Sequence, residues 1–209
     1  MAKALRVTVT VVKIGGSYAR SSRLPDLVAA LCRGGGRVAV VPGGGPFADC
    51  VRNEQPRIRF DDRAAHRMAL LAMAQFGYAL CSLSASLKPA PGVDSVRQIL
   101  ADGGVPVWLP LDLLDGSGDV PENWDMTSDS LAAWLARRLD AARLLLVKSA
   151  APPSAALRDL TAGEIVDPLL PHFLAGAEFE TWLCDARNID VLGEALAADE
   201  GAGLRVALA

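Results

Sequence analysis

The most informative stretch of this chain is Val11-Val12-Lys13-Ile14-Gly15-Gly16-Ser17. It ends an apolar, β-branched run that begins at Val7, and such a run predicts a buried strand. The Gly-Gly-Ser turn that follows exposes backbone N–H groups, which can hold an anion, above all a phosphate. Lys13 interrupts the apolar run, and a charge there is costly unless it has an anionic partner. The stretch alone leaves two equal alternatives: a phosphate site, or a glycine turn beside a lysine that reaches solvent.

A second strand and a second glycine turn follow. Residues 24–31 have helical spacing, and residues 37–41 form another apolar, β-branched run. This run meets the turn Pro42-Gly43-Gly44-Gly45-Pro46, after which residues 47–51 begin a second helix. The order strand, helix, strand, helix favours a parallel sheet covered by helices, with the functional loops at the carboxyl ends of the strands.

The rest of the chain continues this pattern. Residues 61–87 are rich in Ala, Leu and Met on more than one face, which predicts one long helix buried against the sheet and another helix or subunit. Ser128 is expected to cap the helix that continues over residues 131–136, with Asp129 in its first turn. We expect further strands at residues 105–109, 143–148, 181–184 and 204–207, helices at 168–175 and 188–197, and loops at 116–123 and 150–156.

Composition argues against several classes of protein. The chain has 209 residues, of which 51% are hydrophobic, enough for one domain over residues 1–209 with a sizeable core. The net charge of -3 and the lack of a basic block argue against nucleic acid as a partner. No stretch reaches the length of a membrane span. The four cysteines match no zinc spacing and suggest no disulfide framework, which favours a reduced, cytoplasmic location.

Two lysines mark the ends of predicted strands in opposite halves. Lys13 ends the first strand and Lys148 ends the strand at 143–148, although the chain has only two other lysines. Phosphoryl transfer needs point charges and backbone donors around the moving group, with little covalent work by the protein. Neither glycine turn has the phosphate-loop or dinucleotide pattern, so each alone is a weak signal. Both turns together with Asp125-Met126-Thr127-Ser128-Asp129 at a helix start are a stronger one.

Three motifs in order along the chain carry a family resemblance. They are Lys13-Ile14-Gly15-Gly16-Ser17, Pro42-Gly43-Gly44-Gly45-Pro46-Phe47-Ala48 and Thr127-Ser128-Asp129-Ser130. These motifs resemble the signatures of the amino acid kinase superfamily, which includes acetylglutamate, uridylate, aspartate and isopentenyl phosphate kinases. The resemblance implies an α/β fold, a three-layer αβα sandwich with a mostly parallel central sheet.

A narrower resemblance lies within that superfamily. The short length, residues 124–130 and the Ala65-His66 step in the long predicted helix are similar to the small kinase of methanofuran biosynthesis. That enzyme phosphorylates an aminomethylfuran-methyl phosphate to its diphosphate.

The resemblance also implies roles for the matching residues. Lys13 would contact the transferring phosphoryl group, and Asp129 would orient the lysines of the site. Backbone donors would come from Gly15, Gly16 and Ser17. The acceptor side would be formed by Gly43, Gly44, Gly45, Asp125 and Thr127. The N-terminal half would bind the acceptor. The C-terminal half would hold ATP, with Mg²⁺ carried mainly on its phosphates and no metal site built from protein ligands.

Two departures from the superfamily pattern concern the nucleotide side. Lys148-Ser149-Ala150-Ala151-Pro152-Pro153 replaces an Asp-Gly turn that many relatives have after the late strand. Residues 163–168 lack the second catalytic lysine that many relatives carry in this region. Either Lys148 takes that role, as the third expected catalytic residue, or the nucleotide half is altered or lost.

The expected function is therefore an ATP-dependent kinase that acts on a small phosphorylated metabolite, with a phosphate acceptor preferred to a carboxylate. The expected acceptor is an aminomethylfuran-methyl phosphate of methanofuran-type one-carbon cofactor synthesis, and the expected assembly is a homo-oligomer. Two alternatives remain. One is a non-catalytic relative that binds a nucleotide or an oxyanion for storage or regulation, and the other is a purely structural subunit.

Several other side chains have a structural interpretation as the first choice. His66 is expected to be a hydrogen-bonded core histidine rather than a ligand, and Asp61 is expected to cap the long helix. Arg63 and Arg67 lie one turn apart and form a solvated face by default, with a clamp for the acceptor phosphate as the alternative. The four tryptophans are expected to pack, because no basic groove accompanies them.

Overall fold

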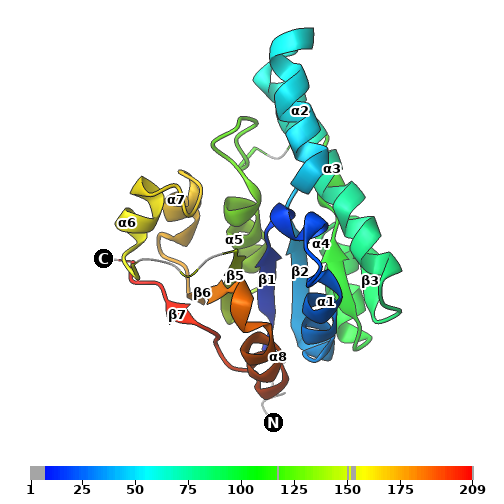
Figure 1. Ribbon diagram of the computed structural model, residues 1–209, viewed down its shortest axis with the longest axis vertical. Helices are drawn as coiled ribbons and strands as arrows, with labels where there is room; N and C mark the ends of the chain where they lie inside the picture. The colour runs from blue at the N-terminus through cyan, green and yellow to red at the C-terminus, as the bar shows by residue number, and fades with distance from the viewer. Residues whose placement is uncertain (1–7, 117, 150, 152–153, 209) are drawn as a thin grey trace.

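The computed structural model describes residues 8–208 except 117, 150, 152 and 153. One seven-stranded sheet runs through this part of the chain (Figure 1). Its strands are β1 (Thr10–Ile14), β2 (Val38–Pro42), β3 (Leu87–Ala90), β4 (Val105–Trp108), β5 (Arg143–Lys148), β6 (Glu180–Asp185) and β7 (Leu204–Arg205). Their order is β3-β4-β2-β1-β5-β6-β7, and neighbours are parallel except β7, which is antiparallel to β6. The predicted mostly parallel sheet is confirmed.

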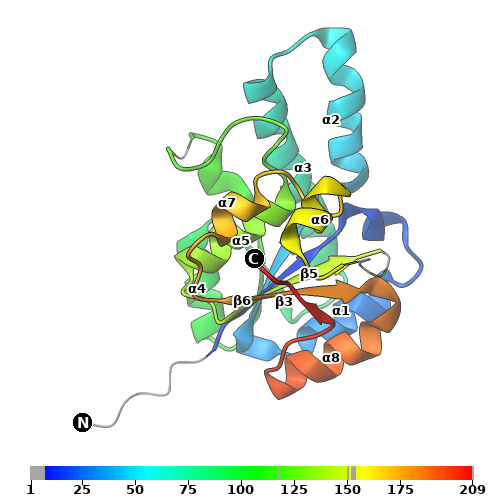
Figure 2. The ribbon, with the colours of Figure 1, turned by 90° about the vertical axis from the view of Figure 1, so that its left-hand side faces the viewer.

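Helices cover both faces of the sheet. They are α1 (Leu24–Cys32), α2 (Gly45–Ile58), α3 (Asp62–Ser82), α4 (Val93–Ala101), α5 (Ser128–Arg138), α6 (Leu157–Ala162), α7 (Leu170–Leu174) and α8 (Ile189–Ala198). Short 3₁₀ helices are η1 (Gly16–Arg20), η2 (Gly35–Arg37), η3 (Pro110–Leu113) and η4 (Ala186–Asn188). Figure 2 shows α1 and α8 on one side of the sheet and α5, α6 and α7 on the other. The three-layer αβα sandwich is therefore confirmed.

The alternation of side chains along the central strands places the two lysines. Val11 of β1 packs in the core beneath α5, whereas Val12 packs in the core beneath α1 and α8. Successive side chains of a strand point to opposite faces, so Lys13 shares the face of Val11. By the same alternation Lys148 shares the face of Leu146, which also lies in the core beneath α5. Both lysines thus face the layer that contains α5.

The long predicted helix ends earlier than expected. α3 stops at Ser82, and β3 and α4 follow it, so the prediction of one helix over residues 61–87 is wrong at its C-terminal end. β3 is an edge strand in which Leu87 and Ala90 are buried while Lys88 and Pro89 are exposed. Charges and prolines are common at sheet edges, and here they interrupt the apolar pattern that identifies a strand.

Other boundaries differ as well. The expected loop at 150–156 is followed by the unpredicted helix α6, and the last strand is shorter than predicted. The N-cap of α5 is Thr127, so the prediction that Ser128 caps this helix is wrong by one residue. The expected strand start at Val7 and part of the expected loop at 150–156 lie outside the described residues.

α2 and α3 form a hairpin that extends beyond the carboxyl ends of the strands (Figure 1). Asp61 caps α3, because its carboxylate accepts a hydrogen bond of 2.7 Å from the backbone N of Ala64; this prediction is confirmed. The buried side of α3 packs against β2, β3 and β4, while Met68, Leu71 and Tyr78 are exposed on it. None of the helices in the described part of the chain is both long and apolar enough to cross a membrane.

Candidate active site

Lys13, Asp129 and Lys148 meet at the carboxyl ends of β1 and β5. Lys13 lies one residue before the end of β1, and Lys148 is the last residue of β5, the neighbouring strand. Asp129 lies in the first turn of α5. Its Oδ1 is 2.9 Å from Lys13 Nζ, and its Oδ2 is 2.5 Å from Lys148 Nζ. The three residues expected to be catalytic thus form one group, with a carboxylate between two ammonium groups.

The charges of this group are buried but balanced against one another. The side chains of Lys13, Asp129 and Lys148 are only 8%, 5% and 14% exposed. Burial favours protonation of Asp129, but the two lysine charges outweigh it and lower the pKa of Asp129 to about 2. The pKa of Lys148 lies below its ordinary value because of burial and the nearby Lys13 charge, which Asp129 opposes. Asp129 therefore remains a carboxylate throughout the physiological pH range.

A second carboxylate, Asp167, holds the helix that carries Asp129. Its Oδ2 accepts hydrogen bonds from the Thr127 backbone N (3.2 Å), the Thr127 hydroxyl (2.8 Å) and the Ser130 backbone N (2.9 Å). Its Oδ1 accepts a short hydrogen bond from the Ser130 hydroxyl. Asp167 is thus the group that caps α5, although it lies in the segment between α6 and α7. The sequence did not identify this residue, because nothing local links position 167 to an N-cap residue 40 positions away.

The two glycine turns touch each other. A Cβ on Gly16 would lie 2.2 Å from the backbone N of Gly45, and one on Gly43 would lie 2.6 Å from the backbone N of Gly16. Gly45 also has a positive φ of 54°, which favours glycine. The close packing of the two turns therefore requires glycine at these positions, whether or not their backbone also approaches a substrate.

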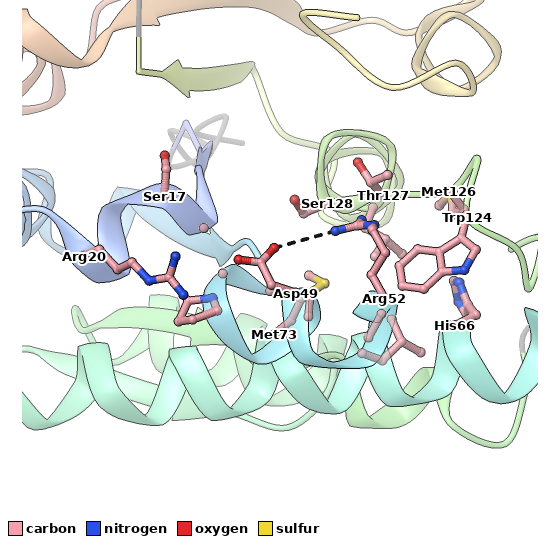
Figure 3. A pocket seen from close by; sticks show the side chains of 18 residues that line it. Ser17, Arg20, Asp49, Arg52, His66, Met73, Trp124, Met126, Thr127 and Ser128 are labelled. Atoms are coloured by element: carbon pink, nitrogen blue, oxygen red, sulfur yellow. Dashed lines mark ion pairs between the residues drawn. The ribbon is translucent and has the colours of Figure 1, made fainter. Parts of the chain in front are cut away.

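A cavity of about 480 Å³ opens between the glycine turns, the α2–α3 hairpin and the start of α5 (Figure 3). Five of the expected site residues line it: Gly16, Ser17, Gly44, Gly45 and Thr127. The other expected site residues, all within the described part of the chain, do not line it, and Asp125 is exposed; they are Lys13, Gly15, Gly43, Asp125, Asp129 and Lys148. Its apolar wall comes from Leu70, Met73, Met126 and Leu131. An apolar body ending in an anionic group therefore matches this cavity.

Charged and aromatic residues that the sequence analysis missed also line the cavity. Arg20, at the end of η1, lines the cavity, and its side chain lies at one end of it in Figure 3. Asp49 and Arg52 lie one turn apart on α2, with Asp49 Oδ1 3.7 Å from Arg52 Nη1. The Arg52 guanidinium lies 4.6 Å from the centre of the Trp124 ring. The i, i+3 spacing of Asp49 and Arg52 was visible in the sequence, but not the cavity beside it.

His66 is buried, and its Nδ1 lies 3.3 Å from the carbonyl oxygen of Asn123. This confirms the expected hydrogen-bonded histidine, although its ring also reaches the cavity. Burial lowers the pKa of His66, so the ring is neutral at pH 7. Arg63 and Arg67 both donate to Glu122 Oε2 at 3.1 Å. Both arginines therefore hold the loop before α5. This role differs from the two that the sequence suggested, a solvated face and a clamp for the acceptor phosphate.

A smaller cavity of about 230 Å³ lies next to the same glycine turn. Its lining includes Ser17, which it shares with the larger cavity, together with Ser149, Arg23 and Arg187. The Tyr18 hydroxyl beside it is buried and has no hydrogen-bond partner in the described part of the molecule. Two guanidinium groups and a free hydroxyl suit a polyanionic ligand. Among the described residues, no group of three or more His, Cys, Asp or Glu side chains could hold a metal ion.

The fold and this site define an α/β protein with a cationic, glycine-lined centre at the carboxyl ends of its parallel strands. The chain belongs to the amino acid kinase family, whose sequence model matches residues 8–151. The superfamily resemblance of the three motifs is thereby confirmed.

Individual relatives agree with this assignment. The chain is 24% identical over 138 residues to the [5-(aminomethyl)furan-3-yl]methyl phosphate kinase of Methanocaldococcus jannaschii. That match covers 65% of this chain and spans 63% of the relative's length. Among solved structures, uridylate kinase from Archaeoglobus fulgidus has a TM-score of 0.73 at 18% identity, with 96% of this chain and 100% of that chain covered. UMP kinase from Ureaplasma parvum has a TM-score of 0.73 at 13% identity, with 97% of each chain covered. These two structures support the fold.

Proposed function

We propose that this protein is an ATP-dependent phosphotransferase whose acceptor is a small phosphate monoester. One observation carries the proposal: Ser128 and Ser149, the sequence neighbours of Asp129 and Lys148, line two cavities that share Ser17. The larger cavity, built mainly by the N-terminal half, would bind the acceptor. The smaller one, which includes Ser149 and Arg187, would take the phosphates of ATP. Donor and acceptor would then meet at the glycine turn.

The proposed reaction needs charge compensation more than a general base. A phosphate monoester has a second pKa of about 6, so its attacking oxygen is already ionised at pH 7. That oxygen forms a bond to the γ-phosphorus of ATP, the bond between this phosphorus and the β–γ bridging oxygen breaks, and ADP leaves. Lys13 and Lys148 would offset the negative charge that gathers there. Asp129, with its low pKa and both oxygens engaged by lysines, would orient the ammonium groups rather than accept a proton.

Mg²⁺ fits this scheme as a companion of ATP. Both oxygens of Asp129 are engaged by lysines, and the described residues provide no cluster of metal ligands. Bound on the ATP phosphates, Mg²⁺ would supply further positive charge during transfer. The residues of this chain would hold that complex through Ser17, Arg23 and Arg187, which line the smaller cavity.

The aminomethylfuran-methyl phosphate named for the Methanocaldococcus relative would be accommodated by the larger cavity. Arg20 and the backbone N–H groups of the glycine turns would bind its phosphate. The apolar wall and Trp124 would contact its furan ring, and Asp49 would face its amino group. We therefore propose this compound, or a close one-carbon-cofactor precursor, as the acceptor.

The second candidate is a non-catalytic relative that binds a nucleotide or an oxyanion. The sequence Lys148-Ser149-Ala150-Ala151-Pro152-Pro153, which stands where many relatives have an Asp-Gly turn, favours this candidate. Phosphorus NMR of ATP, Mg²⁺ and a panel of phosphate monoesters separates the two candidates. Formation of ADP and a diphosphate product, lost in Lys13→Met, supports the kinase. Nucleotide binding without product in the whole panel favours the second candidate.

We also propose that the protein forms a homo-oligomer through α3. Met68, Leu71 and Tyr78 are 38%, 42% and 55% exposed. Their spacing of three and seven residues puts them on one stripe of the helix. This exposed apolar stripe, in which the exposed Gln75 lies between Leu71 and Tyr78, favours burial against another surface. A second copy of the same helix would provide that surface.

A further inference from the structure

Asp167 is a buried carboxylate outside the lysine group, and both of its oxygens accept hydrogen bonds. It is 6% exposed, and its two oxygens accept four hydrogen bonds from Thr127 and Ser130. A carboxylate offers about four such acceptor sites. Thr127 and Ser130, which carry the donors, flank Ser128 and Asp129 in the sequence. Asp167 therefore fixes the first turn of α5, from which Asp129 contacts the lysines.

The cap of α5 is unusual in its origin. Helix N-termini are commonly capped by the side chain of the N-cap residue itself. Thr127 occupies that position and has a suitable hydroxyl, yet it donates this hydroxyl to Asp167. The segment between α6 and α7 thereby supplies a capping carboxylate, although the local Thr127 hydroxyl could have capped the helix. The same contact fixes Thr127, which lines the larger cavity.

We propose that Asp167 is a positioning residue that holds Asp129 between Lys13 and Lys148. This role rests on the proposed phosphotransfer function for its kinetic consequence, but not for its geometry. The segment between β5 and β6 would thus contact both sites through Asp167. It would hold the turn that carries Asp129, and it would hold Thr127 in the wall of the acceptor cavity.

The electrostatic part of the role follows from what surrounds Lys148. Lys13 from β1 disfavours its charge, whereas Asp129 from α5 and Asp167 from the α6–α7 segment raise its pKa. Asp185, its register neighbour on β6, is engaged by Arg187. Asp167→Asn would remove one of the two anions that support Lys148 and would place an amide N–H₂ among four donors. The pKa of Lys148 would then fall further below its ordinary value.

The pKa of Lys148 can be measured by NMR, because the chain has only four lysines and hence few lysine signals. In protein labelled with ¹³C at lysine Cε, the Lys148 signal is assigned by its loss in Lys148→Met. We expect its titration midpoint to fall by at least about half a pH unit in Asp167→Asn. The matched control is Asp159→Asn, an exposed carboxylate on α6, which should leave that midpoint unchanged. This arm requires no enzyme activity, so it tests the placement of Asp167 even if the protein transfers no phosphoryl group.

Kinetics test the consequence for transfer. We expect kcat of Asp167→Asn to fall by about 10- to 100-fold, because displacement of a catalytic group by about 1 Å can cost 100-fold. KM for ATP should change by less than about threefold, and the alkaline limb of kcat should move to lower pH. Ser130→Ala, which removes one donor, should shift both kcat and the Lys148 midpoint in the same direction but less. A lower Tm in both variants with an unchanged Lys148 midpoint and unchanged kcat would show that Asp167 is only a helix cap.

Discussion

Asp129 is a side chain that burial alone would leave protonated. The two lysines reverse this, and they bring the pKa of Asp129 to about 2, below the ordinary 3.8. Neither lysine would be stable in its place without the carboxylate, because a buried charge needs a partner. The three charges are thus mutually dependent, because Asp129 offsets both lysine charges and each lysine favours the charged form of Asp129.

Asp129→Asn should therefore reduce turnover while leaving the backbone of α5 in place. Loss of one preorganised electrostatic contact typically lowers kcat by about 100-fold or more. Asp190→Asn is the matched control, because Asp190 also lies in the first turn of a helix, α8, but is exposed. Steady-state rates of purified variants check this, and a wild-type rate in Asp129→Asn would remove Asp129 from the mechanism.

The same residue should affect acid stability. Because the pKa of Asp129 is lower in the folded than in the unfolded protein, its ion pairs stabilise the fold fully above about pH 4. This contribution declines as the pH falls toward about 2. Urea unfolding at pH 7 and pH 3 should show a smaller pH-dependent loss of stability in Asp129→Asn than in the wild type. Equal losses in both proteins would mean that Asp129 is not paired in solution.

Lys148 departs from the family pattern, and it is where substitution is most informative. Lys148→Met keeps the apolar stem but removes the charge beside Asp129. It should lower kcat strongly and raise the Kd of the nucleotide only modestly, since the transferring group carries charge on several sides. Lys88→Met, on the exposed edge strand β3, is the control. If Lys148→Met had wild-type kinetics while Lys13→Met was inactive, an arginine would have to supply the second positive charge at the transferring phosphoryl group. Arg20 and Arg187 would be the first candidates.

At the scale of elements, the two glycine turns act as one unit. The turn after β1 and the turn after β2 approach so closely that glycine is required where they meet. Gly45→Ala would add a Cβ 2.8 Å from the Gly16 carbonyl oxygen at a residue with φ of 54°. The left-handed conformation alone costs about 1–2 kcal/mol for a non-glycine residue. We expect a loss of at least that size in the free energy of unfolding, measured in urea.

Gly118→Ala is the matched control, because a Cβ there would meet nothing within 4 Å. It should unfold like the wild type. If Gly45→Ala were equally neutral, the contact between the two turns would not contribute to stability.

The elements that could be predicted from sequence are those with a strong local signal. β1, β2 and β5 are mainly apolar runs, and a glycine turn or a lysine marks where each ends. β3 was missed because its burial depends on the sheet edge. α4 has an apolar stripe of Val93, Val96 and Leu100 that packs on the core, and the sequence prediction overlooked this stripe. α6 follows a stretch rich in Ala and Pro that gives no periodicity. Periodicity identifies elements only where one face is consistently buried.

At the scale of the whole molecule, the site combines residues from distant segments. Sequence motifs placed Lys13, Asp129 and Lys148 correctly at one edge of the sheet, since parallel strands share that edge. Arg20, Arg52 and Asp167 could not be found in this way. Arg20 and Arg52 become site residues only through the approach of η1 and α2, and Asp167 only through the path of the chain between β5 and β6. Such contacts have no local sequence signature.

The assembly provides the last test, and it concerns the outer face of the α2–α3 hairpin. The stripe of Met68, Leu71 and Tyr78 lies on the helix that also supplies Leu70 and Met73 to the larger cavity. If two copies pair along this stripe, Leu71→Arg would place a charge in the interface and should yield monomers. Val191→Arg is the control, because Val191 is 53% exposed on α8, away from the stripe.

Size-exclusion chromatography with light scattering gives the masses of the three proteins. A dimer or larger species in the wild type and Val191→Arg, with a monomer in Leu71→Arg, supports the α3 interface. A monomeric wild type, or the same oligomer in all three proteins, would exclude it. Because α3 backs the cavity, the monomeric variant should also show a raised KM for the acceptor while the KM for ATP stays near the wild-type value.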